Sequence, residues 1–433
     1  MKSLLLASLI GLSMPAAWGM DLLEVYREAL ANDAQFAAAR AQAEAGRETA
    51  VQGRAGLLPN IGLSANTTYN QNTFSGQDRN YNSNGYGAQL TQPVFRWQNW
   101  VQYQQGQLQV GISEAQLAAA RQDLALRVAQ AYFDVLKAAD VLAAVDTLKT
   151  AASEQLALSK KSFEVGTVTI TDVHEAQSRF DLANAQQLAA ANDLEVKRQT
   201  LTQLIGRPAG ALAPLRDGVR IERPAPADID SWVGSAEGSA YGVQIQQLAA
   251  EIAAREVERN RAAHLPTVDL VARYNKSSTG FSSTTGSSAD STTRSIGLEL
   301  AVPLFAGGAL ASRDREAVAL KMQAEADLES ARRVAALAAR QAYLGVTSGM
   351  AQIGALEAAQ VSSASALEAN RLGYEVGVRI NIDVLNAQSQ LSDTEQQLAA
   401  ARYDTLVAQL QLEAAAGQLD EDDIQRVNGL LAH

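Results

Sequence analysis

The residues that could do chemistry in this chain are few, and their spacing does not favour an enzyme. The three histidines, His174, His264 and His433, stand far apart and lack the spacing of a metal-binding pair. We find no GxSxG nucleophile motif and no phosphate-binding glycine loop. With no cysteine, thiolate metal sites and disulfides are excluded. We read the acidic run DEDD at 420–423 as a solvated tail. The sequence therefore predicts no enzyme activity, no cofactor and no metal site.

The charged and polar residues that do stand out belong to a motif that occurs twice. FEVGTVTITDVHEAQ at 163–177 and YEVGVRINIDVLNAQ at 374–388 are identical at seven of fifteen positions. Gly166 and Gly377 can adopt the left-handed conformation that ends a helix. Side chains that can cap the following helix are Thr169, Thr171 and Asp172 in the first copy and Asn381 and Asp383 in the second. The carboxylates also suit the positive end of a helix, which requires no further role. Each copy predicts a helix–turn–helix tip.

The two tips differ in side chains that could join them. Arg379 stands where the first tip has Val168, and Tyr374 stands where it has Phe163. If the tips lie side by side, Arg379 can pair with Asp172, and the Tyr374 hydroxyl can reach the same carboxylate. An exposed pair of this kind contributes only about 0–1 kcal/mol. We therefore expect a weak latch that a binding partner can open.

The tips are part of a larger duplication that sets the elements around them. AGLLPNIGLSANTTYN at 55–70 parallels AAHLPTVDLVARYNKS at 262–277, and LTQPVF at 90–95 parallels LAVPLF at 300–305. The segment 206–230 between the copies is rich in proline and glycine and lacks helical periodicity. The chain is therefore predicted to be two pseudo-repeats of one unit.

Each repeat is predicted to hold a helix, a strand pair and a long coiled coil. Apolar residues alternate in the strands, as in 61–69 and 268–274, and leave one apolar and one small or polar face. The coiled-coil seam is Leu124, Val128, Ala131, Val135, Ala138, Leu142 and Val145. Four strands are marginal alone, and no open edge is tolerated in a membrane, so several chains are expected to complete one transmembrane β-barrel. A small soluble core built on the aromatics is the alternative.

The expected organisation is mainly α with a β contribution. A signal peptide is predicted at 1–19 and a C-terminal tail at 419–433. Repeat 1 is predicted at 20–205, with strands at about 58–70 and 85–95 and a coiled coil at about 97–205. After a linker at 206–235, repeat 2 is predicted at 236–418, with strands at about 266–276 and 294–304 and a coiled coil at about 308–417.

Composition and the N-terminus indicate an exported protein. Lys2 precedes a short apolar run, and Ala17-Trp18-Gly19 has the small-x-small pattern of a cleavage site. The formal net charge of −11 makes a nucleic-acid role unfavourable. Only 5% of residues are aromatic while alanine is abundant, which is typical of thin coiled coils.

These features together resemble the TolC family of outer-membrane channel-tunnels. The resemblance rests on the DLLEVYREALAND start, both LP and both QPVF/VPLF junctions, and the paired VGxxxxxDVxxAQ tips, and it covers essentially the whole mature chain. The N-terminal segment is most similar to members that serve type I secretion. The resemblance implies a homotrimer with an outer-membrane barrel in contact with lipid and a large periplasmic helical tunnel.

The resemblance also implies a gate and partners. The implied latch consists of Thr171, Asp172, Tyr374 and Arg379. Asp383 should line a constriction as a ring of three carboxylates, and Asn386 stands where the family often has a second acidic ring, so cation selectivity should be weaker. The implied partners are a periplasmic adaptor and an inner-membrane ABC, RND or MFS transporter. Energy would come from the transporter, so the chain itself would be a passive duct for unfolded protein or small molecules.

Three other functions compete with the duct. A secreted periplasmic coiled-coil spacer would need no detergent and would show no conductance. The adaptor itself would need a lipoyl-like β domain and a single hairpin instead of two repeats. An enzyme is disfavoured by the scattered histidines and by carboxylates at the spacing of solvated helix faces.

Overall fold

The computed structural model describes residues 19–74, 76–216, 218–281 and 287–432. The predicted signal peptide at 1–19 lies outside these residues, apart from Gly19. Two compact units divide the chain. One holds the chain up to Ala39, Ala118–Ala240 and the chain from Arg333 onward; the other holds Arg40–Leu117 and Tyr241–Arg332. Over the described residues, no helix combines the length and the hydropathy needed to cross a membrane.

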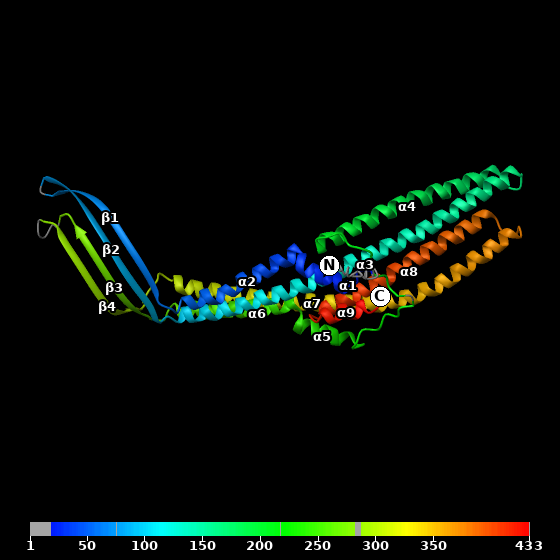
Figure 1. Cartoon of the computed structure of the whole chain (residues 1–433). Helices are drawn as coiled ribbons and strands as arrows, with labels where there is room; N and C mark the ends of the chain where they lie inside the picture. The colour runs from blue at the N-terminus through cyan, green and yellow to red at the C-terminus, as the bar shows by residue number, and fades with distance from the viewer. Residues whose placement is uncertain (1–18, 75, 217, 282–286, 433) are drawn as a thin grey trace, which may run out of the picture. The chain divides into compact units, whose positions relative to one another are not determined.

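The second unit contains one antiparallel sheet of four strands in the order β1-β2-β3-β4 (Figure 1). The strands are β1 (Asn60–Phe74), β2 (Gln77–Phe95), β3 (Thr267–Thr279) and β4 (Ala289–Ala301). The hairpin of each repeat thus lies beside the other, β2 against β3. At the turn ends the strands run further than the alternation predicts. Cross-strand side-chain bonds support this extension, such as Asn70 to Ser83 at 2.8 Å.

The register separates the sheet into two chemically different faces. Ile61 lies opposite Leu90, which lies opposite Ala272, which lies opposite Ile296. Leu298 and Leu300 continue this face and remain 69% and 67% exposed. The other face carries glycine, serine, asparagine and threonine together with the Arg273–Glu299 ion pair at 2.7 Å. The apolar face therefore has no cover within the described chain.

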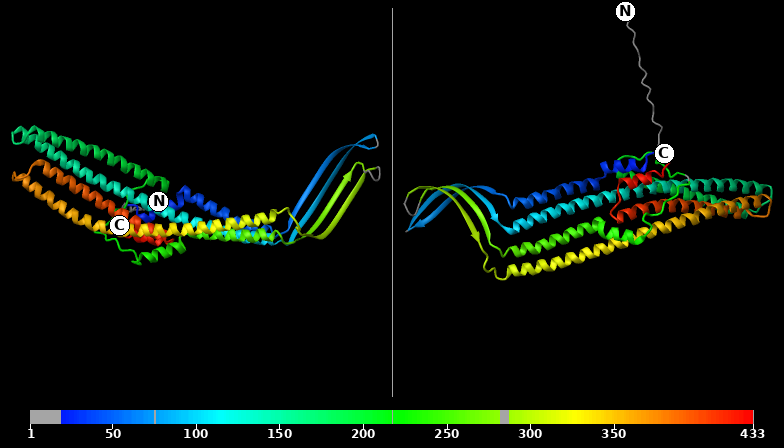
Figure 2. Two further views of the ribbon diagram at one scale, coloured as in Figure 1. Left: turned by 180° about the vertical axis from the view of Figure 1, so that it is seen from behind. Right: turned by 90° about the horizontal axis from the view of Figure 1, so that it is seen from below.

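Four helices run side by side from one end of the sheet, in the order α2, α3, α6, α7 (Figure 2, right). They are α2 (Ala34–Ala55), α3 (Trp97–Glu164), α6 (Tyr241–Ala262) and α7 (Ala309–Glu375), of which α3 and α7 continue into the other unit. Gly106 lets α3 approach α2 closely, since a Cβ there would lie 2.7 Å from the Thr49 carbonyl oxygen. Gln105 donates to Glu256 at 3.0 Å, and Arg261 donates to Asp314 at 3.2 Å.

The first unit pairs the long helices with α4 (Ile170–Ile205) and α8 (Asn381–Ala415), in the order α4, α3, α8, α7. The predicted seam is buried except for Leu142, which is partly exposed; Leu124 and Val128 are fully buried and Val145 is 6% exposed. Ion pairs link neighbours: Lys197 to Asp134 at 3.0 Å, and Arg402 to Glu357 at 2.9 Å. Two repeats, each with a helix, a hairpin and long helices, are thus confirmed.

Three short helices complete the first unit: α1 (Leu22–Asn32), α5 (Ile229–Ser239) and α9 (Glu421–Asn428). Asp33 ends α1 and also caps α2, because its Oδ1 accepts from the Phe36 N–H at 2.7 Å. Its carboxylate also accepts from Arg127 at 3.2 Å. Burial alone would raise the pKa of Asp33, but the hydrogen bonds from Arg127 and Phe36 outweigh burial and lower the pKa.

The C-terminal acidic run is structural, which corrects its interpretation as a solvated tail. Asp420 caps α9 and forms a capping box with Asp423, while Ile424 and Val427 are buried. The linker is also tied down. Leu212 forms a parallel bridge with Met20, and Leu215 forms an antiparallel bridge with Leu431.

Candidate functional site

Both copies of the motif form tight turns between long helices, at the end of the first unit where α3 meets α4 and α7 meets α8 (Figure 1). Gly166 and Gly377 have φ of 76° and 78°. In the first turn the Thr167 N–H donates to the Ser162 carbonyl at 2.9 Å, and in the second the Val378 N–H donates to the Gly373 carbonyl at 2.9 Å. Such six-to-one bonds with a left-handed residue close the ends of helices in the Schellman arrangement.

The first tip begins its second helix with a complete capping box. Thr169 is the N-cap, and its hydroxyl accepts from the Asp172 N–H at 3.3 Å. The Asp172 carboxylate accepts in return from the Thr169 N–H and hydroxyl, both at 2.8 Å. The neighbouring Thr171 is exposed. The Asp172 carboxylate is therefore occupied by its own helix end in this conformation.

The second tip lacks this cap and is held by a tertiary contact instead. Ile380 is the N-cap of α8 and offers no side-chain acceptor. Asn381 follows it, is 9% exposed, and donates its Nδ2 to the Ser159 hydroxyl of α3 at 2.9 Å. This contact was not predicted from the sequence, where Asn381 was read as a cap. The signal was present, because the first repeat has the apolar Ile170 at the equivalent position.

Arg379 pairs within its own tip. Its guanidinium lies 3.6 Å from the Asp383 carboxylate, one helical turn further on. Its stem lies over Gly373, where a Cβ would meet the Arg379 Cγ at 2.6 Å. The first repeat has Ser162 in place of Gly373, so the second repeat has made room for this side chain.

Three of the four predicted latch residues nevertheless line one cavity, and Thr171 does not. Asp172, Tyr374 and Arg379 line a cavity of about 900 Å³ between the two tips. Among the described residues, Asp172 and Arg379 form no ion pair with each other. The latch thus stays a prediction, which would require Arg379 to exchange Asp383 for Asp172.

The Asn386 side chain links the helix pair α7–α8 to the helix pair α3–α4. Its Oδ1 accepts from Arg179 of α4 at 3.0 Å. Two residues further along α8, Gln388 accepts from Arg371 of α7 at 2.9 Å. These hydrogen bonds connect α8 to α4 and to α7.

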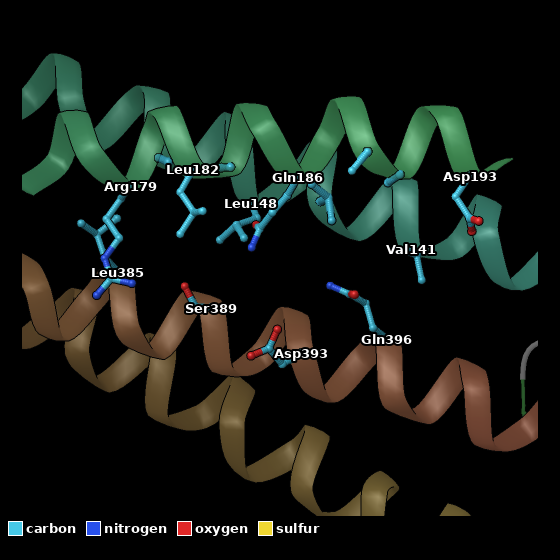
Figure 3. A pocket seen from close by; sticks show the side chains of 15 residues that line it. Val141, Leu148, Arg179, Leu182, Gln186, Asp193, Leu385, Ser389, Asp393 and Gln396 are labelled. Atoms are coloured by element: carbon cyan, nitrogen blue, oxygen red, sulfur yellow. The ribbon is translucent and has the colours of Figure 1, made fainter. Parts of the chain in front are cut away.

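A second cavity of about 520 Å³ lies between α3, α4 and α8 (Figure 3). Leu148 and Leu182 form its apolar wall, and Ser389, Asp393 and Gln396 of α8 face them. Further along α8, the buried Tyr403 donates its hydroxyl to Asp140 of α3 at 2.7 Å. Burial raises the pKa of Asp140, although the hydrogen bond from Tyr403 opposes that rise.

Nothing in this geometry gathers metal ligands or a nucleophile. Within the described ranges, no group of three or more histidine, aspartate or glutamate side chains is placed to hold a metal ion. The two tips are instead joined by weak polar contacts that can exchange partners around the cavity between them, an arrangement suited to opening and closing.

Comparison with known proteins gives these features a context. The family model described as outer membrane efflux protein matches residues 25–207 and 235–418, one match for each repeat. The chain is 32% identical to outer membrane protein TolC of Vibrio cholerae, over 99% of this chain and 98% of that protein. It is 34% identical to the alkaline protease secretion protein AprF of Pseudomonas aeruginosa, over 95% and 87%. It is 31% identical to the proteases secretion protein PrtF of Dickeya chrysanthemi, over 98% and 94%.

Solved structures show the same fold. The Campylobacter jejuni CmeC outer membrane channel superposes with a TM-score of 0.80 at 18% identity, covering 98% of this chain and 95% of that one. The outer membrane protein VceC of Vibrio cholerae superposes with a TM-score of 0.77 at 20% identity, covering 92% and 96%.

Proposed function

The chain belongs to the outer membrane efflux protein family, and from that premise we propose how it works as an exit duct. It is an outer-membrane protein with a large periplasmic part, and its function lies in secretion and efflux. We assign it a passive role: it provides the path, and a transporter in the inner membrane provides the energy. The similarity to secretion proteins, which extends over nearly the whole chain, carries this proposal.

The unpaired sheet edges support assembly from several copies. The outer edges of β1 and β4 have no partner strand among the described residues. In lipid each unpaired backbone group is costly, so these edges must pair with strands of other copies. The family resemblance sets the proposed number of copies at three. The exposed apolar face, with Leu63 at 85%, would then meet lipid, and the polar face would line the path.

The tips form the proposed gate at the periplasmic end. In the closed trimer, Arg379 and Tyr374 would hold Thr171 and Asp172, and Asp383 would stand in a ring of three carboxylates. Asn386 replaces the second ring of the family and is already hydrogen-bonded to Arg179. A periplasmic adaptor would pack a helical hairpin along the coiled coil and separate the tips. Apart from the buried contact between Asn381 and Ser159, the contacts described above are few and largely exposed, so their separation costs little.

The cargo and transporter are proposed from the relatives. AprF and PrtF are named as protease secretion proteins. We therefore favour an unfolded protein as cargo, delivered by an ABC transporter as in type I secretion. Efflux of small molecules through an RND or MFS transporter is the second candidate, because the family is named for efflux. The coiled-coil spacer is not favoured, since nothing in a spacer explains the uncovered apolar face.

Single-channel conductance in planar bilayers tests the duct and its gate. We expect a small conductance for the wild type and a several-fold larger one for Arg379→Ser combined with Tyr374→Phe, because the gate loses its clasp. Arg340→Ser, which removes an exposed cation from α7 away from the tips, is the matched control and should leave conductance unchanged. A wide-open wild type would keep the duct and overturn the gate. Folded protein without any channel would overturn both.

A further inference from the structure

Two cations interrupt the apolar face of the sheet. Lys276 of β3 lies opposite Tyr86 of β2, and Arg294 of β4 lies opposite Tyr274 of β3. The next row toward the helices is the apolar row through Ala272 and Ile296 described above. Since directly opposed residues share a face, Lys276 and Arg294 lie on the same side as the exposed leucines and isoleucines.

Neither cation has a carboxylate partner within the described residues. Cations elsewhere in this unit do: Arg273 pairs with Glu299 at 2.7 Å on the polar face, and Arg259 pairs with Glu256 at 2.6 Å. Arg294 instead lies over the ring of Tyr274, with its Cζ 5.7 Å from the centroid. An acidic side chain on the same face, Asp290, lies opposite Ser278, one row closer to the turn than Lys276, and forms no ion pair within the described residues.

The rings of two tyrosines from adjacent rows belong to this cluster. The rings of Tyr274 and Tyr86 are 6.5 Å apart and tilted. Lys276 and Arg294 are diagonal neighbours across β3 and β4, since Lys276 faces Thr292. Two like charges at this spacing repel each other, and no described protein anion separates them. The cluster therefore carries a local positive charge that the chain itself leaves uncompensated.

The position of the row along the strands sets its depth. Tyr86 and Phe95 are nine residues apart on β2, about 30 Å along a strand at about 3.3 Å per residue. With a strand tilt of about 40°, this spans about 23 Å, close to the apolar band of about 25 Å of outer-membrane strands. Cations on a lipid-facing surface are costly at the midplane and nearly free at the interface. The row of Tyr86 and Lys276 thus lies at headgroup level on the side of the band away from the helices, and β2 continues beyond it to Gln77 at the turn.

We infer that Lys276, Arg294, Tyr274 and Tyr86 bind the phosphate of a phosphorylated outer-leaflet lipid, whose acyl chains cover the apolar rows beneath. The inference rests on the proposed function, because it needs the apolar face in lipid. The planar guanidinium can hold two phosphate oxygens at once, and the ammonium supplies a second charge. Simple snorkelling of each cation toward water explains its depth but not why two unpaired cations stand together.

Lipid binding by the full-length trimer in nanodiscs tests the inference. The probe is bisphosphorylated lipid A doped into phosphatidylcholine, compared with its phosphate-free form. We expect the wild type to retain the phosphorylated lipid about tenfold more tightly, as for charge-assisted contacts to phosphate. Lys276→Gln combined with Arg294→Gln should abolish this preference. Arg273→Gln combined with Lys321→Gln removes equal charge from outside the apolar face and should retain it.

The other arms separate the possible sources of failure. Inorganic phosphate at the same concentration should not displace the lipid, because it lacks the acyl chains; displacement would overturn the assignment to a lipid. Lys276→Arg combined with Arg294→Lys keeps the charges and should keep the preference, which guards against a folding defect. Equal retention of both lipid forms by the wild type would overturn the inference. If the same sample still conducts in planar bilayers, the duct stands; without conductance the duct falls as well.

Discussion

At the scale of single residues, the two tips differ by substitutions that change which polar groups have hydrogen-bond partners. Asn381 replaces Ile170 of the first repeat and places a buried amide against Ser159. Its Oδ1 is buried without a partner among the described residues. A buried amide with one satisfied group is sensitive to the loss of that partner.

We predict that Ser159→Ala destabilises the second tip by about 1–3 kcal/mol, because the Asn381 Nδ2 loses its acceptor while it stays buried. Ser153→Ala, at an exposed position of the same helix, should change stability little. Ser159→Ala combined with Asn381→Leu should recover most of the loss, since both polar partners are then removed. Thermal unfolding of the four proteins measures this; additive losses in the double variant would contradict it.

Asp33 gives a residue-scale prediction about pH. Its folded-state pKa lies below the ordinary value of 3.8, so its contribution to stability is present above pH 3.8 and is lost as pH falls through the folded value. Asp33→Asn keeps the capping ability but removes the charge opposite Arg127. We expect a loss of about 1–3 kcal/mol at pH 7 and a gap to the wild type that closes in acid.

Denaturant unfolding of both proteins between pH 7 and pH 3 measures that gap. Asp123→Asn is the control, because Asp123 also pairs with Arg127 but is 54% exposed, and its loss should cost about 0–1 kcal/mol. A gap for Asp33→Asn that stays constant with pH would show that packing, and not charge, is what the substitution disturbs.

At the scale of elements, the helices after the two turns begin differently. α4 has a threonine cap with a reciprocal aspartate, whereas α8 begins after Ile380 without a side-chain cap. The backbone turns are otherwise closed by the same type of hydrogen bond. The first turn of α8 is therefore the less stable of the two, apart from its Asn381 contact.

We predict that Ile380→Thr stabilises the start of α8 by about 1 kcal/mol, because a hydroxyl can then accept from the N–H of Asp383. Thr169→Ala should cost the start of α4 a similar amount. Amide hydrogen exchange in the first turns of both helices measures the change locally. No slowing in α8 would mean that the backbone at 380 cannot bring a side chain to the helix end.

The sequence predicts some of these elements more accurately than others. Alternation identified the strand pairs, but it ended them early, because the Asn- and Thr-rich halves such as 70–74 pair without an apolar face. The capping box at Thr169 was among the predicted choices. The contact of Asn381 with Ser159 joins residues 222 positions apart, so the sequence signals only that Asn381 replaces an apolar residue and not which partner it meets. Helix α9 is not predicted, because the acidic residues that cap it also suit an exposed tail, and its apolar spacing rests on Ile424 and Val427 alone.

At the scale of the whole molecule, the two faces of the sheet should respond oppositely to charge. Leu298 is 69% exposed on the apolar face, and the neighbouring Ser295 lies on the polar face opposite Arg273. This difference follows from the pairing register alone, so a one-residue change of position reverses the environment.

We predict that Leu298→Lys weakens membrane assembly by about 2–4 kcal/mol per copy, because the ammonium would enter lipid near the midplane. Ser295→Lys should assemble normally and alter only conductance or ion preference. Heat-stable trimer on gels, together with conductance, measures the two effects. Equal tolerance of both substitutions would contradict the proposed placement of the apolar face in lipid.

The segment 211–216 receives both ends of the chain, and this has a consequence for the order of folding. Met20 pairs with it through Leu212, and Leu431 pairs with it through Leu215. The Tyr132 hydroxyl also lies within hydrogen-bonding distance of the Met20 and Ala213 carbonyls, at 3.1 and 2.8 Å. Contacts between such distant residues form late. The bridge to Met20 can form once residue 213 has emerged, but the bridge between Leu215 and Leu431 waits until Leu431 has emerged. A nascent chain therefore keeps this junction open to chaperones and proteases until Leu431 has emerged, and a variant shortened to end before Leu431 leaves the junction unfinished.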